Sequence, residues 1–258
     1  NWLGFVLSFG LMALVALAVA EGRPRGVTTV AGALIVSGLV LSGSRGAWVG
    51  TLAALAVVAA LARPALAWPA ASVTVVAVAL ILVAAPGNVF AGLDDPDPDT
   101  SAGTRVLTWS SGLETVRRHP LLGVGAGNFR TVVKDRGTQV DPNNLILLTW
   151  AETGVVGVVL LGGVVVATLR MAMAGSRRRA DRGGAHDVAN LAGAGIFVAS
   201  LAHAQFDMFW TRGVALATFM GAGLVLWAGR HPGTPPGPGP ALAAVRSRAE
   251  ALTVVSGP

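Results

Sequence analysis

Seven long apolar blocks constrain this chain more than any other feature of its sequence. Each block has 17 to 25 residues, the length that a helix needs to cross the hydrocarbon core of a bilayer, which is about 30 Å thick. A soluble helix would carry a polar stripe opposite its apolar face, and the blocks lack one. They span residues 2–20, 26–42, 46–62, 69–86, 145–169, 188–206 and 213–229.

The composition agrees with lipid as the solvent of these blocks. Hydrophobic residues make up 53% of the chain and charged residues only 12%, about half of the share in an ordinary soluble domain. We therefore predict an all-α fold, a polytopic transmembrane bundle of about seven helices. Residues 1–229 form its single transmembrane domain, and the Pro/Gly-rich residues 230–258 form a disordered tail.

The charge and the missing cysteines exclude several classes of function. The net charge is +6, but the arginines are scattered over short loops without a basic face, so we expect no nucleic-acid partner. The chain has no cysteine, which excludes disulfides, thiol catalysis and Cys-ligated metals. The near absence of lysine is typical of a GC-rich bacterial genome. Residues 2–20 lack the basic region and cleavage site of a signal peptide, so we expect a longer protein with further N-terminal helices.

Residues 87–144 form a long polar loop with 13 charges, which hydrocarbon cannot hold. Counting Lys and Arg on alternate sides of the blocks gives eleven on one side and eight on the other, and six of the eight lie in this loop. Short cytoplasmic loops carry an excess of Lys and Arg, whereas charges in long loops have little effect on orientation. The loop is therefore predicted to be extracytoplasmic and the tail cytoplasmic, in a bacterial cytoplasmic membrane.

Within the loop, residues 104–118 show helical periodicity. Val106, Trp109, Leu113 and Val116 recur at spacings of three and four, which predicts an amphipathic helix. Ser101 or Thr104 caps its start and Pro120 ends it. We expect its other face to present polar and small residues to an outer cavity: Arg105, Thr108, Gly112 and Thr115.

Glycine-rich and acidic segments follow and precede this helix. The run GVGAGN at 123–128 has no preceding strand, so it is predicted to be a tight turn that lets backbone approach the membrane domain rather than a nucleotide loop. The run DDPDPD at 94–99 lacks the pattern of a calcium loop and is interpreted as solvated. Glycines 154, 157, 162 and 163 are expected to permit close helix packing.

Several charged residues stand near or within the blocks. Arg45 is either an arginine that reaches to the membrane interface or a bidentate ligand of an anion. Glu152 lies eight residues into the fifth block, where a carboxylate marks an internal site or is a structural partner of a salt bridge or helix terminus. His203 and Asp207 are one helical turn apart and form either a catalytic pair or a polar helix end. Two such ligands are too few for a metal site, so none is predicted.

Three segments together resemble the O-antigen ligase and polymerase family of bacterial envelope enzymes. They are LSGSRGAWVG (41–50), TRVLTWSSGLETVRRHPLLGVGAGNF (104–129) and PNNLILLTWAETGVVG (142–157), within a similarity that covers about residues 35–225. The resemblance implies an integral membrane glycosyltransferase that moves a glycan from undecaprenyl diphosphate to a lipid or glycan acceptor. It also implies that no nucleotide sugar, metal or other cofactor is needed.

The resemblance assigns roles to residues already singled out. Arg45 and Arg105 match the arginines that hold the lipid diphosphate and stabilise it as it departs. The family has a histidine, its proposed general base, where this chain has Asn143. An amide cannot take a proton near neutral pH, so Glu152 or His203 replaces that base, or the protein is not catalytic.

We therefore carry three hypotheses from the sequence. The first is an inverting glycosyltransferase of the ligase or polymerase type. The second is a family member that binds the lipid-linked glycan in envelope assembly without transferring it. The third is a membrane transporter, which is disfavoured because the charges lie near one face rather than at the midplane.

Overall fold

A computed structural model describes residues 2–21, 26–84, 101–134, 141–177, 184–207 and 214–230, and every regular element in these ranges is a helix. The fold class is therefore confirmed as all-α within the described part of the chain. The elements are α1 (Trp2–Glu21), α2 (Gly26–Leu41), α3 (Arg45–Ala62), the short 3-10 helix η1 (Pro64–Leu66), α4 (Ala67–Ala84), α5 (Ser101–Arg118), α6 (Phe129–Val133), α7 (Leu145–Arg177), α8 (Gly184–His203) and α9 (Val214–Arg230).

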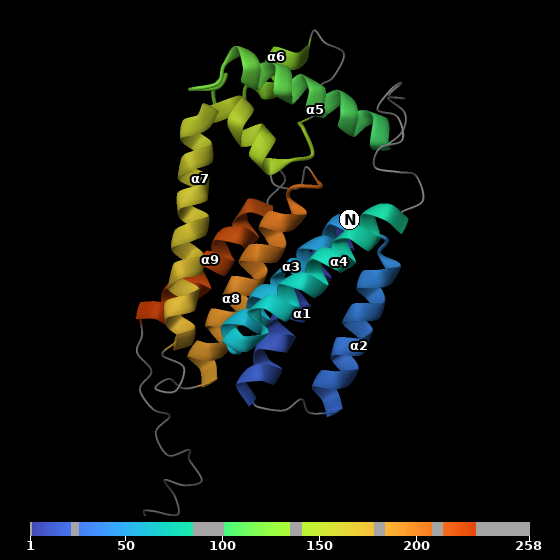
Figure 1. The fold of residues 1–258 in the computed structure, drawn as a ribbon, viewed down its shortest axis with the longest axis vertical. Helices are drawn as coiled ribbons and strands as arrows, with labels where there is room; N and C mark the ends of the chain where they lie inside the picture. The colour runs from blue at the N-terminus through green and yellow to red at the C-terminus, as the bar shows by residue number, and fades with distance from the viewer. Residues whose placement is uncertain are drawn as a thin grey trace, which may run out of the picture.

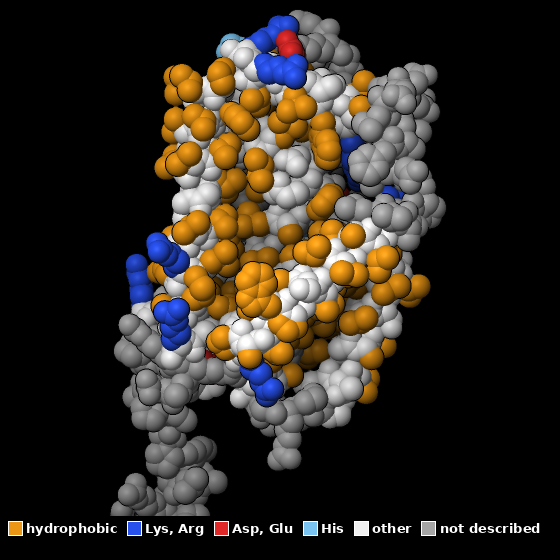
Figure 2. All heavy atoms as spheres, in the orientation of Figure 1, with side chains coloured by type: hydrophobic (Ala, Val, Ile, Leu, Met, Phe, Trp, Pro, Cys, Tyr) orange, Lys and Arg blue, Asp and Glu red, His pale blue; other side chains and the backbone are white. Residues whose placement is uncertain are grey.

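Helix length and hydropathy identify a membrane protein. Four helices, α1, α3, α7 and α8, are long and apolar enough to cross a bilayer. The other apolar helices, α2, α4 and α9, are not among these four candidates, so the number of about seven spans stays a prediction. Hydrophobic side chains cover the middle of the molecule, and basic side chains gather toward its two ends (Figure 2).

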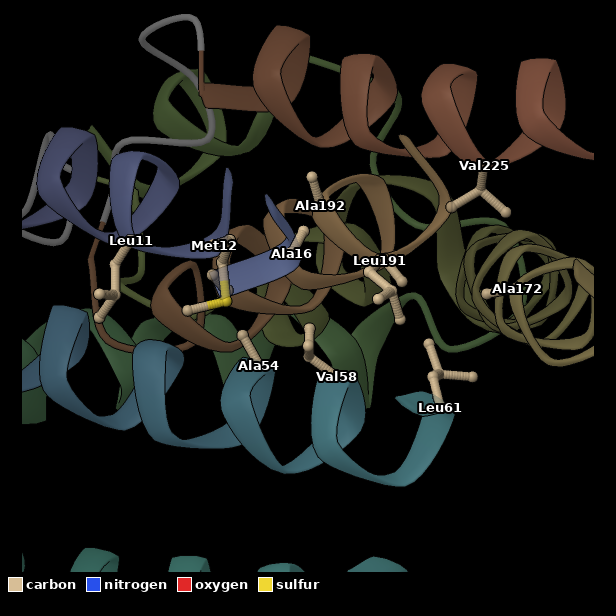
Figure 3. Close-up of a cluster of buried hydrophobic side chains, with 12 residues drawn as sticks. Leu11, Met12, Ala16, Ala54, Val58, Leu61, Ala172, Leu191, Ala192 and Val225 are labelled. Atoms are coloured by element: carbon tan, nitrogen blue, oxygen red, sulfur yellow. The ribbon is translucent and has the colours of Figure 1, made fainter. Parts of the chain in front are cut away.

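Helix α8 lies at the centre of the bundle because it packs against α1, α3 and α9. The buried cluster between these helices, closed on one side by α7, consists of small and medium apolar side chains (Figure 3). Its members are Leu11, Met12, Ala16, Ala54, Val58, Leu61, Ala172, Leu191, Ala192, Ala194, Ala199 and Val225.

The close contacts of α8 with α9 and with α3 depend on glycines outside the expected set. A Cβ on Gly193 would lie 2.7 Å from the carbonyl oxygen of Gly221, and the reverse holds at the same distance, so α8 and α9 touch through backbone. Gly50 brings α3 equally close to the backbone of α8. The expectation for Gly162 and Gly163 is wrong, because an added Cβ there would meet nothing within 4 Å.

Helices α5 and α6 lie across one end of the bundle, and α7 runs from this layer alongside α8 and α9 (Figure 1). Helix α7 is not straight: Gly154 has φ 66° and ψ −167°, which kinks it. Residues 145–153, before the kink, pack against α5 and α6 through a second apolar cluster. That cluster consists of Val116, Phe129, Val133, Leu148 and Ala151.

The glycine turn after α5 docks onto this kink, as the sequence predicted. Gly123, Gly125 and Gly127 all have positive φ, a conformation that residues with a side chain rarely adopt. A Cβ at Gly123 would overlap the backbone of Glu152 in α7. Only glycine therefore allows the two backbones to meet.

Hydrogen bonds across the turn replace those that the kink breaks. The N–H of Val124 donates to the carbonyl of Ala151 at 3.0 Å, and the N–H of Gly125 donates to the carbonyl of Glu152 at 2.8 Å. In return, the N–H of Val155 donates to the carbonyl of Pro120 at 3.0 Å. The kink thus leaves none of these backbone groups without a partner, which is what burial requires.

Helix α5 forms as predicted, but the expectation that Thr108, Gly112 and Thr115 face an outer cavity is wrong. Thr108 and Thr115 are each 1% exposed, and a Cβ on Gly112 would lie 2.9 Å from Leu147 of α7, whereas Leu113 is 52% exposed. The threonine hydroxyls donate to carbonyls one turn back in their own helix, at 3.1 and 2.8 Å. Since these hydroxyls need no outside partner, the small-residue face can pack against α7.

Three expectations concern segments outside the described residues. These are the acidic run at 94–99, the arginine-rich loop at 178–182 and the Pro/Gly-rich tail at 231–258.

Candidate functional site

The start of α3 holds Arg45 at the same end of the bundle as the α5 layer. Ser44 caps α3 by accepting a hydrogen bond from the N–H of Ala47 at 3.3 Å. The indole N–H of Trp48 donates to the carbonyl of Leu39 at 2.8 Å, which ties the start of α3 to the end of α2. Gly43, with φ 62°, makes the tight turn between the two helices. Arg45 is therefore fixed at its backbone, with a half-buried side chain.

The end of α8 meets the start of α3 through His203. This histidine is 2% exposed, and its ring packs edge-on against Phe5, with ring centroids 5.4 Å apart. A Cβ on Gly46 would lie 3.0 Å from His203 Cδ2. His203 is thus in contact with the residue that follows Arg45.

The start of α7 is attached to the same end of α8. The N–H of Leu145 donates to the carbonyl of Ala204 at 2.9 Å, and the Asn144 side chain donates to the carbonyl of Gln205 at 3.4 Å. Asn144 also caps α7, because its Oδ1 accepts from the N–H of Leu147 at 2.9 Å. Asn143, the position of the family histidine, is therefore held beside the segment that contains His203.

Arg105 of α5 completes this end of the bundle. Burial lowers the pKa of its guanidinium below the ordinary value, the Asp207 carboxylate acts to raise that pKa, and the nearby Arg45 lowers it further. Arg45 and Asp207 therefore each lie within electrostatic range of Arg105. The three come from α3, α5 and the end of α8, far apart in the sequence.

Glu152 lies elsewhere, next to the kink of α7 rather than inside a straight span. Its Oε1 accepts a hydrogen bond from the N–H of Phe129, the first residue of α6, at 3.5 Å. It also acts to raise the pKa of Arg130. Of the interpretations left open, a structural partner of a helix terminus is the one observed. Gly154, two residues later, bends α7.

An ion pair that sequence reasoning missed holds the loop near this point. The Nε of Arg130 donates to Asp141 Oδ1 at 2.9 Å, and a second bond joins the other nitrogen and oxygen of the pair. Asp141 is 4% exposed, and its hydrogen bond raises the pKa of Arg130. No spacing rule links positions 130 and 141, so only the fold could identify the pair.

Trp109 is a second residue that the sequence reasoning did not assign to the site. It was placed on the apolar face of α5, yet its indole nitrogen is buried without a hydrogen-bond partner among the described residues. The same holds for Arg105 Nε and Asn143 Oδ1. The signal in the sequence was the four-residue spacing from Arg105, which puts both side chains on one face of a helix.

Within the described ranges, no three His, Asp or Glu side chains come together as a metal site would require. This end of the bundle offers instead two guanidinium groups and one carboxylate, together with a buried histidine and an amide. Guanidinium groups bind phosphate oxygens through two parallel hydrogen bonds. This end of the bundle is therefore suited to an anionic ligand with polar substituents.

The fold defines a helical membrane protein. Arg45, Arg105 and Asp207, the basic cluster, mark a polar site where the α5 layer meets the bundle. A model of the O-antigen ligase family matches residues 30–162, which are more than half of the chain. The chain belongs to the O-antigen ligase family. The match includes Arg45, Arg105, Asn143 and the docked glycine turn, whereas His203 and Asp207 lie beyond it. A comparison with curated proteins found no match.

Proposed function

We propose that this protein transfers a glycan from undecaprenyl diphosphate to a lipid or glycan acceptor at the outer face of the bacterial cytoplasmic membrane. One observation carries the proposal: Arg105 is partly desolvated and lies within electrostatic range of a second arginine, Arg45. Two like charges held together repel each other unless an anion joins them, and Asp207 offsets only one of the two. A diphosphate supplies the missing negative charge.

In the proposed reaction, an acceptor hydroxyl attacks the anomeric carbon of the donor sugar. The bond to the diphosphate oxygen breaks, and the leaving group departs with its electron pair on the face opposite the attack, which inverts the configuration. Arg45 and Arg105 stabilise the charge that develops on the diphosphate, as preorganised donors do at a leaving group. The acceptor's proton passes to a base.

His203 is the base that we propose, because it lies beside Gly46 and hence beside Arg45. Glu152 is the weaker candidate since its carboxylate accepts a hydrogen bond from α6. Asn143 occupies the family histidine's position but cannot accept a proton. That substitution also supports a second candidate function, a family member that binds the lipid-linked glycan without transferring it.

The proposed orientation has the α5 layer outside the cell. Four exposed arginines lie at or near the ends of α3, α7 and α9, which all run away from the α5 layer (Figure 1). Membrane-spanning helices have an excess of Lys and Arg near their cytoplasmic ends. The four arginines are Arg63, Arg170, Arg177 and Arg230.

A transfer assay tests the proposal. The protein is reconstituted in nanodiscs with a polyprenyl-diphosphate glycan and an acceptor, and product formation is measured. Arg45→Lys and Arg105→Lys should each lower transfer by on the order of tenfold or more, because lysine keeps the charge but loses the planar fork. Arg117→Lys, at an exposed position on α5, is the matched control.

Two results would count against this function. Full transfer by both lysine variants would make the arginines simple interfacial charges. Tight binding of the lipid by the parent, with no transfer to any acceptor, would instead support the non-catalytic family member.

A further inference from the structure

Three buried polar atoms near the basic cluster have no hydrogen-bond partner in the described part of the chain. They are Arg105 Nε and Trp109 Nε1 on α5, and Asn143 Oδ1 just before α7. Buried polar groups in proteins are nearly always satisfied, so each exception requires an explanation. A bound ligand explains all three if they face one place.

The packing of α5 on α7 brings these residues together. Gly112 lies against Leu147, and farther along both helices Val116 and Leu148 belong to the same buried cluster. The two helices therefore advance side by side in the same direction. One turn back from Gly112 lies Trp109, and about one turn back from Leu147 lies Asn143.

The end of α8 connects Trp109 and Asn143 to the basic cluster. Leu145, two residues after Asn143, is hydrogen-bonded to Ala204, three residues before Asp207. Asp207 is the carboxylate that interacts with Arg105. Arg105 and Trp109 are one helical turn apart on α5, so their side chains lie on the same face of this helix.

The chemistry of Asn143 Oδ1 excludes a diphosphate oxygen as its partner, and a ligand that serves both Asn143 and Trp109 must therefore donate as well as accept. An indole N–H only donates a hydrogen bond, and the amide oxygen of Asn143 only accepts one. Phosphate oxygens at neutral pH accept, so they cannot satisfy the Asn143 oxygen. A sugar hydroxyl both donates and accepts, and neighbouring hydroxyls on one ring can serve the two groups together.

We propose that Trp109 and Asn143 bind hydroxyl groups of the sugar attached to the diphosphate, and so form the donor-sugar subsite. This inference rests on the proposed function, because it places the sugar next to a diphosphate held by Arg45 and Arg105. It gives Asn143 a role in selecting the donor, in place of the proton transfer that its amide cannot perform.

The test compares two kinds of lipid in nanodiscs. One is a polyprenyl diphosphate without sugar; the others are the same lipid bearing glucose, galactose, N-acetylglucosamine or N-acetylgalactosamine. The parent should bind at least one sugar-bearing lipid more tightly than the sugarless lipid, by on the order of tenfold for two neutral hydrogen bonds. Trp109→Phe and Asn143→Ala should each reduce this preference severalfold without changing the affinity for the sugarless lipid.

Two further variants separate this effect from general damage. Trp150→Phe also removes an indole N–H, but that group already donates to the carbonyl of Pro120 at 3.2 Å, so the sugar preference should persist. Arg105→Lys should weaken binding of both kinds of lipid.

Each outcome decides the inference. Equal losses for both kinds of lipid in Trp109→Phe and Asn143→Ala, or no change in either, would overturn the sugar subsite while the diphosphate site stands. A parent that prefers none of the four sugars would overturn it as well. A parent that binds neither kind of lipid would overturn the proposed function and the subsite with it.

Discussion

The backbone of Gly154 lies directly against that of Leu121, so that a Cβ at Gly154 would overlap the Leu121 carbonyl group. Gly154 also has φ 66°, in the left-handed region that favours glycine. This contact joins the kink of α7 to the turn after α5. It thereby holds the α5 layer, with Arg105 and Trp109, over the end of the bundle.

Replacing Gly154 should therefore detach this layer. We expect Gly154→Ala to lower the free energy of unfolding by about 2 kcal/mol or more, since positive φ alone costs about 1–2 kcal/mol and the overlap adds to it. Thermal unfolding in detergent measures the change, and limited proteolysis near residues 119–134 reports the release of the turn.

The matched control lies on the same helix. At Gly162 an added Cβ meets nothing within 4 Å, so Gly162→Ala should be neutral or stabilising by up to about 1 kcal/mol. Equal stability of the Gly154 and Gly162 variants would show that the kink does not hold the layer.

Labelling of single cysteines tests the proposed orientation. The chain has no cysteine of its own, and Ser110 of α5 and Ala185 at the start of α8 are both exposed. An impermeant thiol reagent on intact cells should label Ser110→Cys, and it should label Ala185→Cys only after the cells are opened. The opposite pattern would reverse the topology.

Kinetic analysis distinguishes the candidate bases. His203→Gln should reduce kcat by about 10² or more, as loss of general-base assistance does, with an unchanged unfolding temperature as the check on folding. Glu152→Gln should leave kcat within a few-fold. Asn143→Ala should raise KM for the donor more than it lowers kcat, because it removes a binding contact.

The reverse pattern would contradict this assignment. A variant at Asn143 that abolishes kcat, together with full activity of His203→Gln and Glu152→Gln, would place the chemistry at Asn143. A gain of kcat in Asn143→His would instead show that this member lacks an efficient base.

Asp207 should control release of the diphosphate product. Arg45, Arg105 and Asp207 together carry a net charge of +1, from two positive groups and one negative group. Asp207→Asn raises this to +2, so inhibition by the diphosphate product should strengthen by roughly three- to tenfold. Both KM and kcat should fall, because release slows.

Asp207→Glu and Glu114→Gln are the controls for this effect. The first keeps the charge and should retain most of the parent's behaviour. The second removes a carboxylate from an exposed ion pair with Arg118 on α5, where solvent screens it. Weaker product inhibition in Asp207→Asn would show that Asp207 only supports the fold.

The sequence by itself determined the helices, the docked turn and the family. Long apolar runs leave the backbone no partner in lipid except its own helix, so the blocks predicted α1 to α4, α8 and α9 closely, whereas α7 extends to Arg177 and is kinked. The glycines at 123, 125 and 127 predicted a close backbone approach because only glycine adopts their φ values freely. The arginines at 45 and 105 were singled out by charge beside apolar segments and by the family's pattern.

Only the tertiary structure decided which faces and partners these residues have. Periodicity placed Trp109 on an apolar face and Thr108 on a polar one, but threonine hydroxyls bond their own helix and can be buried, whereas an indole N–H cannot reach such a partner. The kink at Gly154 follows directly after the segment that carries Glu152, and the Glu152 carboxylate accepts a hydrogen bond from the start of α6. The grouping of Arg45, Arg105 and Asp207 depends on how three helices pack, because electrostatic interactions act across space and leave no spacing in the sequence.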